Sequence, residues 1–230
     1  SPELLNVWVA YMNLENMHGT AESLTTIFRR AISHSDDTLI VHEKLADIFS
    51  ATKKFQQLNA LCRVMTSKYR TVSRVWERLG KNLIDAGKRD QLKRTIKDIN
   101  TSGALKKDEQ AMVITHLCIH EFKHGSIESG RSLFEALLSR LPKKSDVWSA
   151  FIDQELSLLA RKAAEGSINA VRDLFSRVTG IAHPPKVMQQ LFTRFLNFEQ
   201  AYGDASDVDR VKTAARKYVE SRIAETTATA

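Results

Sequence analysis

The sequence predicts an all-α fold, a right-handed superhelical solenoid of about six stacked helix-turn-helix repeats. Two observations lead to this prediction. The chain of 230 residues contains only 4 Pro and 9 Gly, which is sparse for a β-rich fold built on tight turns, and it is rich in good helix formers. A pattern of apolar and acidic residues also returns at intervals close to 34 residues, and internal repetition of this length is typical of helical solenoids.

The repeated pattern begins with Trp8, Tyr11 and Glu15, whose i, i+3, i+7 spacing places them on one stripe of a helix. Gly19 follows four residues later, where that helix can end, and Phe28 stands nine residues beyond in a second helical stretch. The template starts at residues 8, 42, 76, 114, 148 and 192, at intervals of 34, 34, 38, 34 and 44. Each repeat is therefore predicted to form a helix A, a short turn and a helix B.

The repeats are expected to form one elongated domain over residues 1–225, because a lone helical hairpin cannot bury its apolar face without stacked neighbours. The predicted repeats are about 3–34, 37–70, 72–101, 108–141, 145–181 and 185–223, followed by a disordered tail at 226–230. The signature residues expected to build the inter-helix core and its support are Trp8, Tyr11, Glu15, Phe28, Trp76, Glu121, Phe134, Trp148, Phe151, Glu155, Phe175, Phe195 and Glu199. The acids among them are expected to pair with Arg or backbone groups, because an unpaired buried carboxylate is costly.

Two repeats depart from the template. The fifth carries 7 extra residues, about two turns of helix, and its helix A is predicted to run from near Val147 to about Glu165. In the sixth, Lys212 stands where an aromatic residue is expected. This suits a terminal repeat, which needs a more polar outer surface.

The sequence carries no membrane or catalytic signal. No apolar run approaches the ~20 residues that span a bilayer, and there is no Gly-rich phosphate loop, G-x-S-x-G elbow or H-E-x-x-H helix. Cys62 and Cys118 are expected to be buried in a reducing compartment. We expect no enzymatic activity, no cofactor and no small-molecule substrate. The missing initiator Met suggests a piece of a longer protein.

One histidine stripe resembles a metal-binding pattern. His116, His120 and His124 follow one another at i, i+4 and i+8, and two histidines at i, i+4 can bind zinc. The apolar face of the same helix carries Ile114 and Leu117, however, so the histidines are interpreted as a solvated polar stripe rather than as metal ligands.

Charge is the most informative functional feature. The chain has 34 basic and 27 acidic residues, a formal net charge of +7. Residues 53–107 alone carry 15 Lys or Arg against four acids, so this segment is strongly basic on a mildly acidic body. The candidate patch comprises Arg74, Arg78, Lys81, Lys88, Arg89, Lys93, Arg94 and Lys97. Clustered cations favour binding of RNA phosphates; an acidic protein partner and a purely solvated face are the alternatives.

The motifs Trp8-x-x-Tyr11-x-x-x-Glu15 and Trp148-x-x-Phe151-x-x-x-Glu155 resemble the HAT (half-a-TPR) repeat, and the runs starting at Phe28 and Phe134 match its second half. Repeats two and three depart from it and are similar to TPR-like repeats in general. HAT repeats occur in nuclear RNA-processing proteins. The opening stretch is most similar to the C-terminal HAT region of the large eukaryotic pre-rRNA processing factor with a string of OB-fold RNA-binding domains upstream.

This resemblance implies a scaffold in the nucleolus or nucleus that acts in pre-rRNA processing and small-subunit processome assembly. Its partners would be ribosome-assembly proteins and the rest of its own longer chain, with pre-rRNA as a further candidate and no membrane. The alternative is a protein-binding HAT module of a splicing or mRNA 3′-end-processing complex. Further HAT repeats on both sides would favour that alternative.

Overall fold

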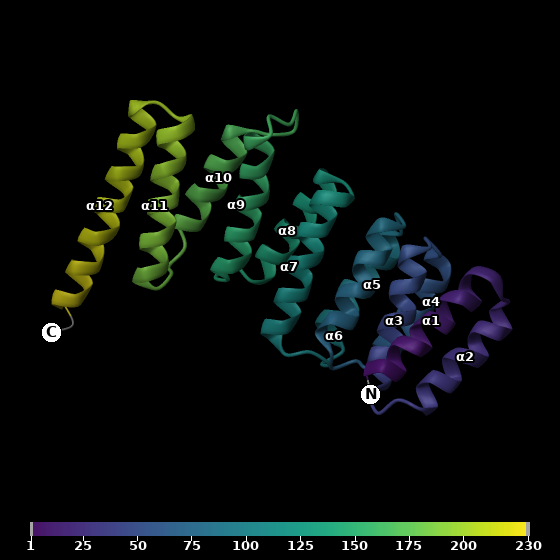
Figure 1. Cartoon of the computed structure of the whole chain (residues 1–230). Coiled ribbons are helices and arrows are strands. Elements are labelled where there is room, and N and C mark those ends of the chain that lie inside the picture. Colours follow the sequence, from purple (N-terminus) through teal and green to yellow (C-terminus); the bar gives the residue numbers. More distant parts are fainter. Residues whose placement is uncertain (1, 229–230) are drawn as a thin grey trace. The chain divides into compact units, whose positions relative to one another are not determined.

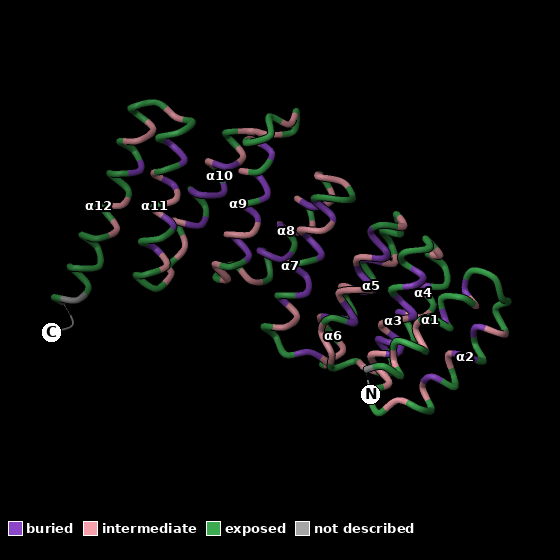
Figure 2. Tube along the Cα trace, in the orientation of Figure 1, coloured by how far each residue is buried: buried purple, intermediate pink, exposed green. Residues whose placement is uncertain are grey.

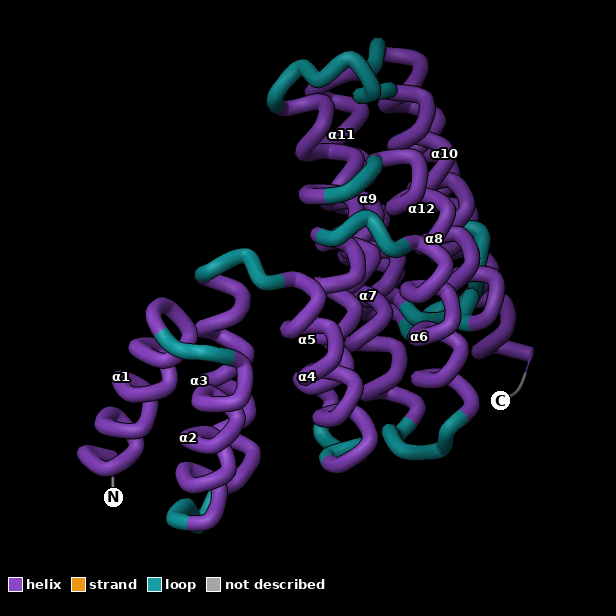
Figure 3. The backbone as a smooth tube through the Cα atoms, turned by 90° about the vertical axis from the view of Figure 1, so that its right-hand side faces the viewer, coloured by secondary structure: helices purple, strands orange, loops and turns teal. Residues whose placement is uncertain are grey.

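The chain is helical throughout in a computed structural model that describes residues 2–228 (Figure 1). Over that range it forms twelve α-helices and no strand, which confirms the all-α prediction. Short loops join the helices (Figure 3). In chain order the helices are α1 (Pro2–His18), α2 (Ala21–Ser33), α3 (Thr38–Ala51), α4 (Phe55–Lys68), α5 (Ser73–Asp85), α6 (Arg89–Thr101), α7 (Lys107–His124), α8 (Ile127–Arg140), α9 (Ser145–Ala160), α10 (Ile168–Thr179), α11 (Pro185–Tyr202) and α12 (Ala205–Ala228).

The helices divide into two compact units. The first, Ser1–Ser126, contains α1–α7, and the second, Ile127–Ala230, contains α8–α12. The division falls between α7 and α8, which the sequence assigned to one repeat. The arrangement of all six repeats as one continuous superhelical domain therefore stays a prediction, and each unit is described by itself.

In the first unit, each helix packs on its chain neighbour and successive A helices also pack on one another. Thus α5 contacts α4, α6 and α7, and α1 contacts both α2 and α3. Buried positions recur on the faces turned toward neighbouring helices, and exposed positions follow the outer faces (Figure 2). The most deeply buried side chains of this unit include Met12, Val41, Cys62, Met65, Leu83, Ile99, Val113, Leu117 and Cys118.

In the second unit, each B helix presents an aromatic ring to the next A helix. Phe134 of α8 stacks on Phe151 of α9, with ring centroids 4.7 Å apart and planes 3° from parallel. Phe175 of α10 stacks on Phe195 of α11 at 5.0 Å and 8°. Such pairs contribute about 0.5–1.5 kcal/mol beyond area burial. Phe134 and Phe175 occupy one repeat position, and Phe151 and Phe195 occupy another, so the same contact occurs in two successive repeats.

Two kinds of turn join helix A to helix B. In the fourth repeat, the Glu121 carboxylate folds back over Gly125 and accepts a hydrogen bond from the Ser126 backbone N–H at 3.2 Å. A Cβ on Gly125 would lie 2.6 Å from that carboxylate. The second and third repeats have no such Glu. There Lys53 and Gly87 take left-handed φ angles of 55° and 67°, a conformation that favours glycine.

The predicted extension of the fifth helix A is wrong. Helix α9 ends at Ala160, and residues 161–167 form a turn in which Lys162 has a φ of 52°. The Ala163 N–H donates to the Leu158 carbonyl at 2.9 Å, which closes the helix end. The Glu165 carbonyl accepts from the Arg131 guanidinium at 2.8 Å, so the inserted loop is tied to α8 instead of continuing into solvent.

Two further expectations need correction. Tyr11 was expected in the core, yet it is 40% exposed on α1, in line with Leu4, Val7 and Leu14. No helix packs on that side of α1 within its unit. The tail predicted from residue 226 begins inside α12, which is helical as far as Ala228, because nothing in the turn-poor sequence there stops the helix. Residues 229–230 lie outside the described residues.

Candidate basic interaction surface

The basic segment divides into two faces with different surroundings. On α5, the three predicted patch residues are already engaged by carboxylates. Arg74 donates to Glu43 of α3 at 2.6 Å, and Arg78 donates to Asp47 of α3 at 2.8 Å. Lys81 pairs with Glu77 within α5 at 2.5 Å. Arg74 and Arg78 thus join α5 to α3, Lys81 is paired within α5, and all three are poorly placed to neutralise phosphates.

The histidine stripe of α7 is also engaged. His116 contacts Glu77 at 3.0 Å, and His120 contacts Asp85 at 2.7 Å, so both histidines pair with acids of α5, although His116 is also exposed to solvent. His124 packs its ring on His120 with centroids 4.5 Å apart. No group of three or more His, Cys, Asp or Glu suited to a metal ion occurs within the described residues.

Glu77 joins these contacts, because it accepts from both Lys81 and His116. Burial is the largest single influence on its carboxyl and raises the pKa, but the hydrogen bonds from Lys81 and His116 and the charges of these two residues together leave the pKa below its usual value. Glu77 is therefore ionised near neutral pH and supports the junction of α5 with α7.

These pairs follow one direction along the chain. In the first unit, the acid lies on the earlier A helix and the base on the later one, at Glu43–Arg74, Asp47–Arg78, Glu77–His116 and Asp85–His120. The second unit repeats the rule, since Asp153 of α9 pairs with Arg194 of α11. We refer to these five pairs as the helix-A ladder.

Helix α6 and its N-cap present the other half of the predicted patch, here named the α6 basic surface. It consists of Lys88, Arg89, Lys93, Arg94 and Lys97. All five are exposed, and none forms an ion pair with a residue in the described part of the chain. The opposite face of α6 is buried through Leu92, Thr95 and Ile99, which leaves the cations on an otherwise accessible side.

Neighbouring contacts extend this surface onto α4. Gln91 of α6 accepts from Arg63 of α4 at 2.9 Å and from Asn59 at 3.4 Å. Arg70, just beyond α4, donates to the Ser102 carbonyl at 3.3 Å. Both arginines bind neutral groups and keep their charge uncompensated. At ~1.5 Å per residue, Lys88 to Lys97 spans roughly 14 Å, a length that covers a few phosphates of a strand. The positive N-terminal end of the α6 dipole adds to the same field.

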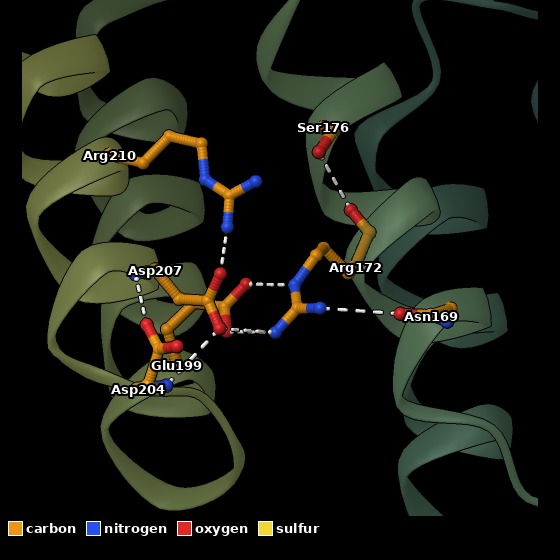
Figure 4. Close-up of polar contacts among 7 residues, drawn as sticks. All are labelled: Asn169, Arg172, Ser176, Glu199, Asp204, Asp207 and Arg210. Carbon is orange, nitrogen blue, oxygen red and sulfur yellow. Dashed lines mark hydrogen bonds and ion pairs between the residues drawn. The ribbon is translucent and has the colours of Figure 1, made fainter.

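Two of the signature acids are gripped by arginines. Arg172 of α10 grips Glu199 of α11 through two hydrogen bonds of 2.6 and 2.8 Å and also donates to Asp207 of α12 at 2.9 Å (Figure 4). Arg210 pairs with Asp207 from the other side. Arg131 of α8 grips Glu155 of α9 in the same bidentate way, at 2.6 and 2.9 Å.

Sequence reasoning missed which arginines would pair with these acids. Arg131 and Arg172 stand three residues before Phe134 and Phe175, so the common spacing Arg-x-x-Phe was the available signal. The other two acids use local groups: Glu15 accepts from the Ser23 hydroxyl at 2.5 Å, and Glu121 caps Ser126 as described.

The two cysteines are buried, and burial raises the pKa of both thiols, to about 11 for Cys62. They match the sequence interpretation of small apolar core residues. Within residues 2–228, no helix has the length and apolar character needed to cross a bilayer.

No protein-family model matches the chain. Among curated proteins it is 36% identical over 220 residues to the mouse "Protein RRP5 homolog", which covers 96% of this chain and 11% of that protein. It is 33% identical over 226 residues to the Arabidopsis thaliana "rRNA biogenesis protein RRP5", again 96% of this chain and 11% of the relative. A shorter match, 29% over 104 residues, joins it to the "Pre-mRNA-splicing factor CLF1" of Debaryomyces hansenii, at 44% of this chain and 14% of that protein. The chain thus spans about a ninth of the length of the RRP5 relatives.

Proposed function

We propose that this chain, a relative of the RRP5 proteins over nearly all of its length, is a scaffold region of a large rRNA-biogenesis protein. Its helical repeats would bind ribosome-assembly proteins in the nucleolus, and the α6 basic surface would contact pre-rRNA. The observation that carries the proposal is the match to proteins named for rRNA biogenesis over 96% of the chain. The fold agrees with it, since stacked helical repeats provide extended binding surfaces.

A binding role fits the chemistry of the surface better than catalysis does. The signature carboxylates are bound by arginines, hydroxyls or backbone groups, and both thiols are buried and have raised pKa values. Five exposed basic residues without an ion-pair partner among the described residues lie instead along one helix, α6, as expected for a site that recognises a polyanion.

The RNA part of the proposal rests on the α6 basic surface alone, because Arg74, Arg78 and Lys81 are paired. The test compares Lys93→Glu/Arg94→Glu/Lys97→Glu with the unchanged chain. Binding to two unrelated 30-nucleotide single-stranded RNAs is measured by fluorescence anisotropy across a series of salt concentrations. We expect the unchanged chain to bind both RNAs similarly, because phosphate contacts carry no sequence information.

The triple variant should bind both RNAs much more weakly, and its log–log salt slope should fall by about 0.7 for each phosphate that it no longer neutralises. A matched control, Lys123→Glu/Arg216→Glu/Lys217→Glu, changes the net charge equally at exposed positions elsewhere and should retain most of the affinity. A folded α6 variant that binds RNA as well as the unchanged chain would remove RNA from the proposal and leave the protein scaffold.

A module of a splicing complex is the second candidate, favoured by the match to the splicing factor CLF1. That match covers less than half of the chain, at 29% identity, whereas the RRP5 matches cover 96% at 33–36%. Placing the α6 variant in the full-length protein and measuring pre-rRNA intermediates against spliced mRNA would separate the two. Accumulation of unspliced mRNA with normal pre-rRNA would favour the second candidate.

A further inference from the structure

An open apolar groove lies between the last two helices of the second unit. Phe192 and Leu196 of α11 line one side, and Val219 and Ile223 of α12 line the other, around a volume of about 910 Å³. Val219 and Ile223 are 52% and 59% exposed. They continue the stripe that starts with the buried Val211. Large apolar side chains gathered around one hollow are typical of an interaction site.

The preceding repeat shows what such a groove accommodates. There α11 lies on α10, with Phe195 stacked on Phe175 and Glu199 gripped by Arg172. The groove of α11 and α12 is the corresponding face one repeat later, and by this correspondence its occupant would be a helix laid along it. A helix-in-groove contact of this kind is a common mode of peptide recognition.

Two residues of α12, Lys212 in the groove lining and Asp209 outside it, differ from those at the equivalent positions of α10. Counting from Gly166 and from Gly203, Lys212 of α12 occupies the position of Phe175, and Asp209 occupies the position of Arg172. A further repeat with a phenylalanine and a glutamate like those of α11 would set an aromatic ring against an ammonium and a carboxylate against a carboxylate. The ammonium can lie favourably on an aromatic ring, but the two carboxylates repel each other, and this repulsion disfavours a helix of that type.

Lys212 lines the groove without an ion-pair partner among the described residues, and the other charged lining residue, Arg222, is also basic. No acid from the described part of the chain lines it. We propose that this groove binds an amphipathic helix of a partner protein that carries an acidic residue within its apolar stripe, opposite Lys212. The apolar side chains would supply most of the binding, and the Lys212 ammonium would select for the acid, since charge complementarity acts mainly on specificity.

The test uses two 18-residue helical peptides, the length of α11, with the same leucine stripe and either Glu or Lys at its centre. Binding to the chain is measured by fluorescence anisotropy. The Glu peptide should bind about tenfold more tightly than the Lys peptide, and Lys212→Glu should reverse that order. The control Lys217→Glu lies on the exposed side of α12, outside the groove, and should leave both affinities unchanged.

Three results would overturn the proposal. One is that neither peptide binds better than a scrambled, non-amphipathic sequence. Another is that Lys212→Glu, shown to be folded by circular dichroism, leaves the order of affinities as it was. The third is a chain that dimerises in sedimentation experiments and becomes monomeric with Val219→Glu, since the occupant would then be a second copy. None of these results depends on RNA binding, so the α6 test and this one can fail separately.

Discussion

Repeats two and three, in the first unit, and repeats five and six, in the second, fill the same position of helix A in opposite ways. In the first unit, α3 and α5 place Phe49 and Leu83 there, and Leu83 is 0% exposed. In the second unit, α9 and α11 place Glu155 and Glu199 there, each 1% exposed and each gripped by an arginine from the preceding B helix. Where the acid is missing, that arginine is missing too: Thr25 and Asn59 stand at its position.

In these four repeats, the residue at this position of helix A and the residue that faces it from the preceding helix B change together. An apolar side chain needs no partner, whereas a buried carboxylate must be matched by a cation with good geometry. Both solutions fill the same space between successive helices. An acid at this position, together with an arginine three residues before the aromatic residue of the preceding helix B, therefore indicates from sequence how a repeat is joined to the one before it.

Placing an acid in the third repeat without its arginine partner should have the largest effect on stability. Leu83→Glu buries an unpaired carboxylate where a leucine is completely enclosed, and it should lower the free energy of unfolding by at least about 4 kcal/mol. Urea denaturation followed by circular dichroism measures the loss. Adding Asn59→Arg should recover part of it, and equal stability of the single and double variants would contradict the pairing rule.

Removing the cation from the second unit should cost somewhat less. Arg131→Met leaves Glu155 buried and unpaired, and we expect a loss of about 3 kcal/mol. The double variant Arg131→Met/Glu155→Leu, which copies the apolar solution of the first unit, should regain most of the stability. The control Arg140→Met, at the exposed end of α8, should change the midpoint little.

The turns provide a smaller test. Gly125→Ala places a Cβ against the Glu121 carboxylate and should displace it from the Ser126 N–H, at a cost of about 1 kcal/mol. Gly180→Ala meets only ordinary contacts at 3.4 Å and serves as the control. If thermal unfolding shows both variants equally stable, the acid does not need the close approach that glycine allows.

The smallest effect is expected in the helix-A ladder. Arg78 is partly exposed and Asp47 more so, and such pairs contribute about 0–1 kcal/mol. Arg78→Ala should therefore lower stability by less than about 1 kcal/mol, and the difference should shrink in high salt. A loss of stability as large as that caused by Arg131→Met would contradict this prediction, because it would mean that the exposed pairs of the helix-A ladder stabilise the fold as much as the buried pairs do.

Periodicity was sufficient to predict the helices, because each apolar stripe must face a neighbour. It was also sufficient to predict that the buried acids would be paired. Periodicity could not predict the structure of the insertion in the fifth repeat, because its 7 extra residues fit two helical turns or a closed loop equally well. The loop is selected by a tertiary hydrogen bond from Arg131 to the Glu165 carbonyl. The prediction that Arg74 and Arg78 belong to an open basic patch missed tertiary contacts in the same way. The numbers of charged residues do not indicate that Glu43 and Asp47 lie opposite these two arginines.

The direction of the helix-A ladder has a consequence for how such chains can lengthen. Helix α5 carries both the basic and the acidic residues of the helix-A ladder. Arg74 and Arg78 pair with α3, and Glu77 and Asp85 pair with α7. In a tandem duplication of α5 and α6, the acidic face of α5 in the first copy would lie against the second copy of α5. It would meet there the face that carries Arg74 and Arg78, which in this chain lies against α3. The junction is heterologous, with two different complementary faces, and such junctions can be added end to end without closing on themselves. Such a duplication would keep a pair of the Glu43–Arg74 kind, because Glu77 stands at the position of Glu43. It would set Lys81, which stands at the position of Asp47, opposite Arg78 of the next copy, so only one of the two pairs would be matched at the new boundary.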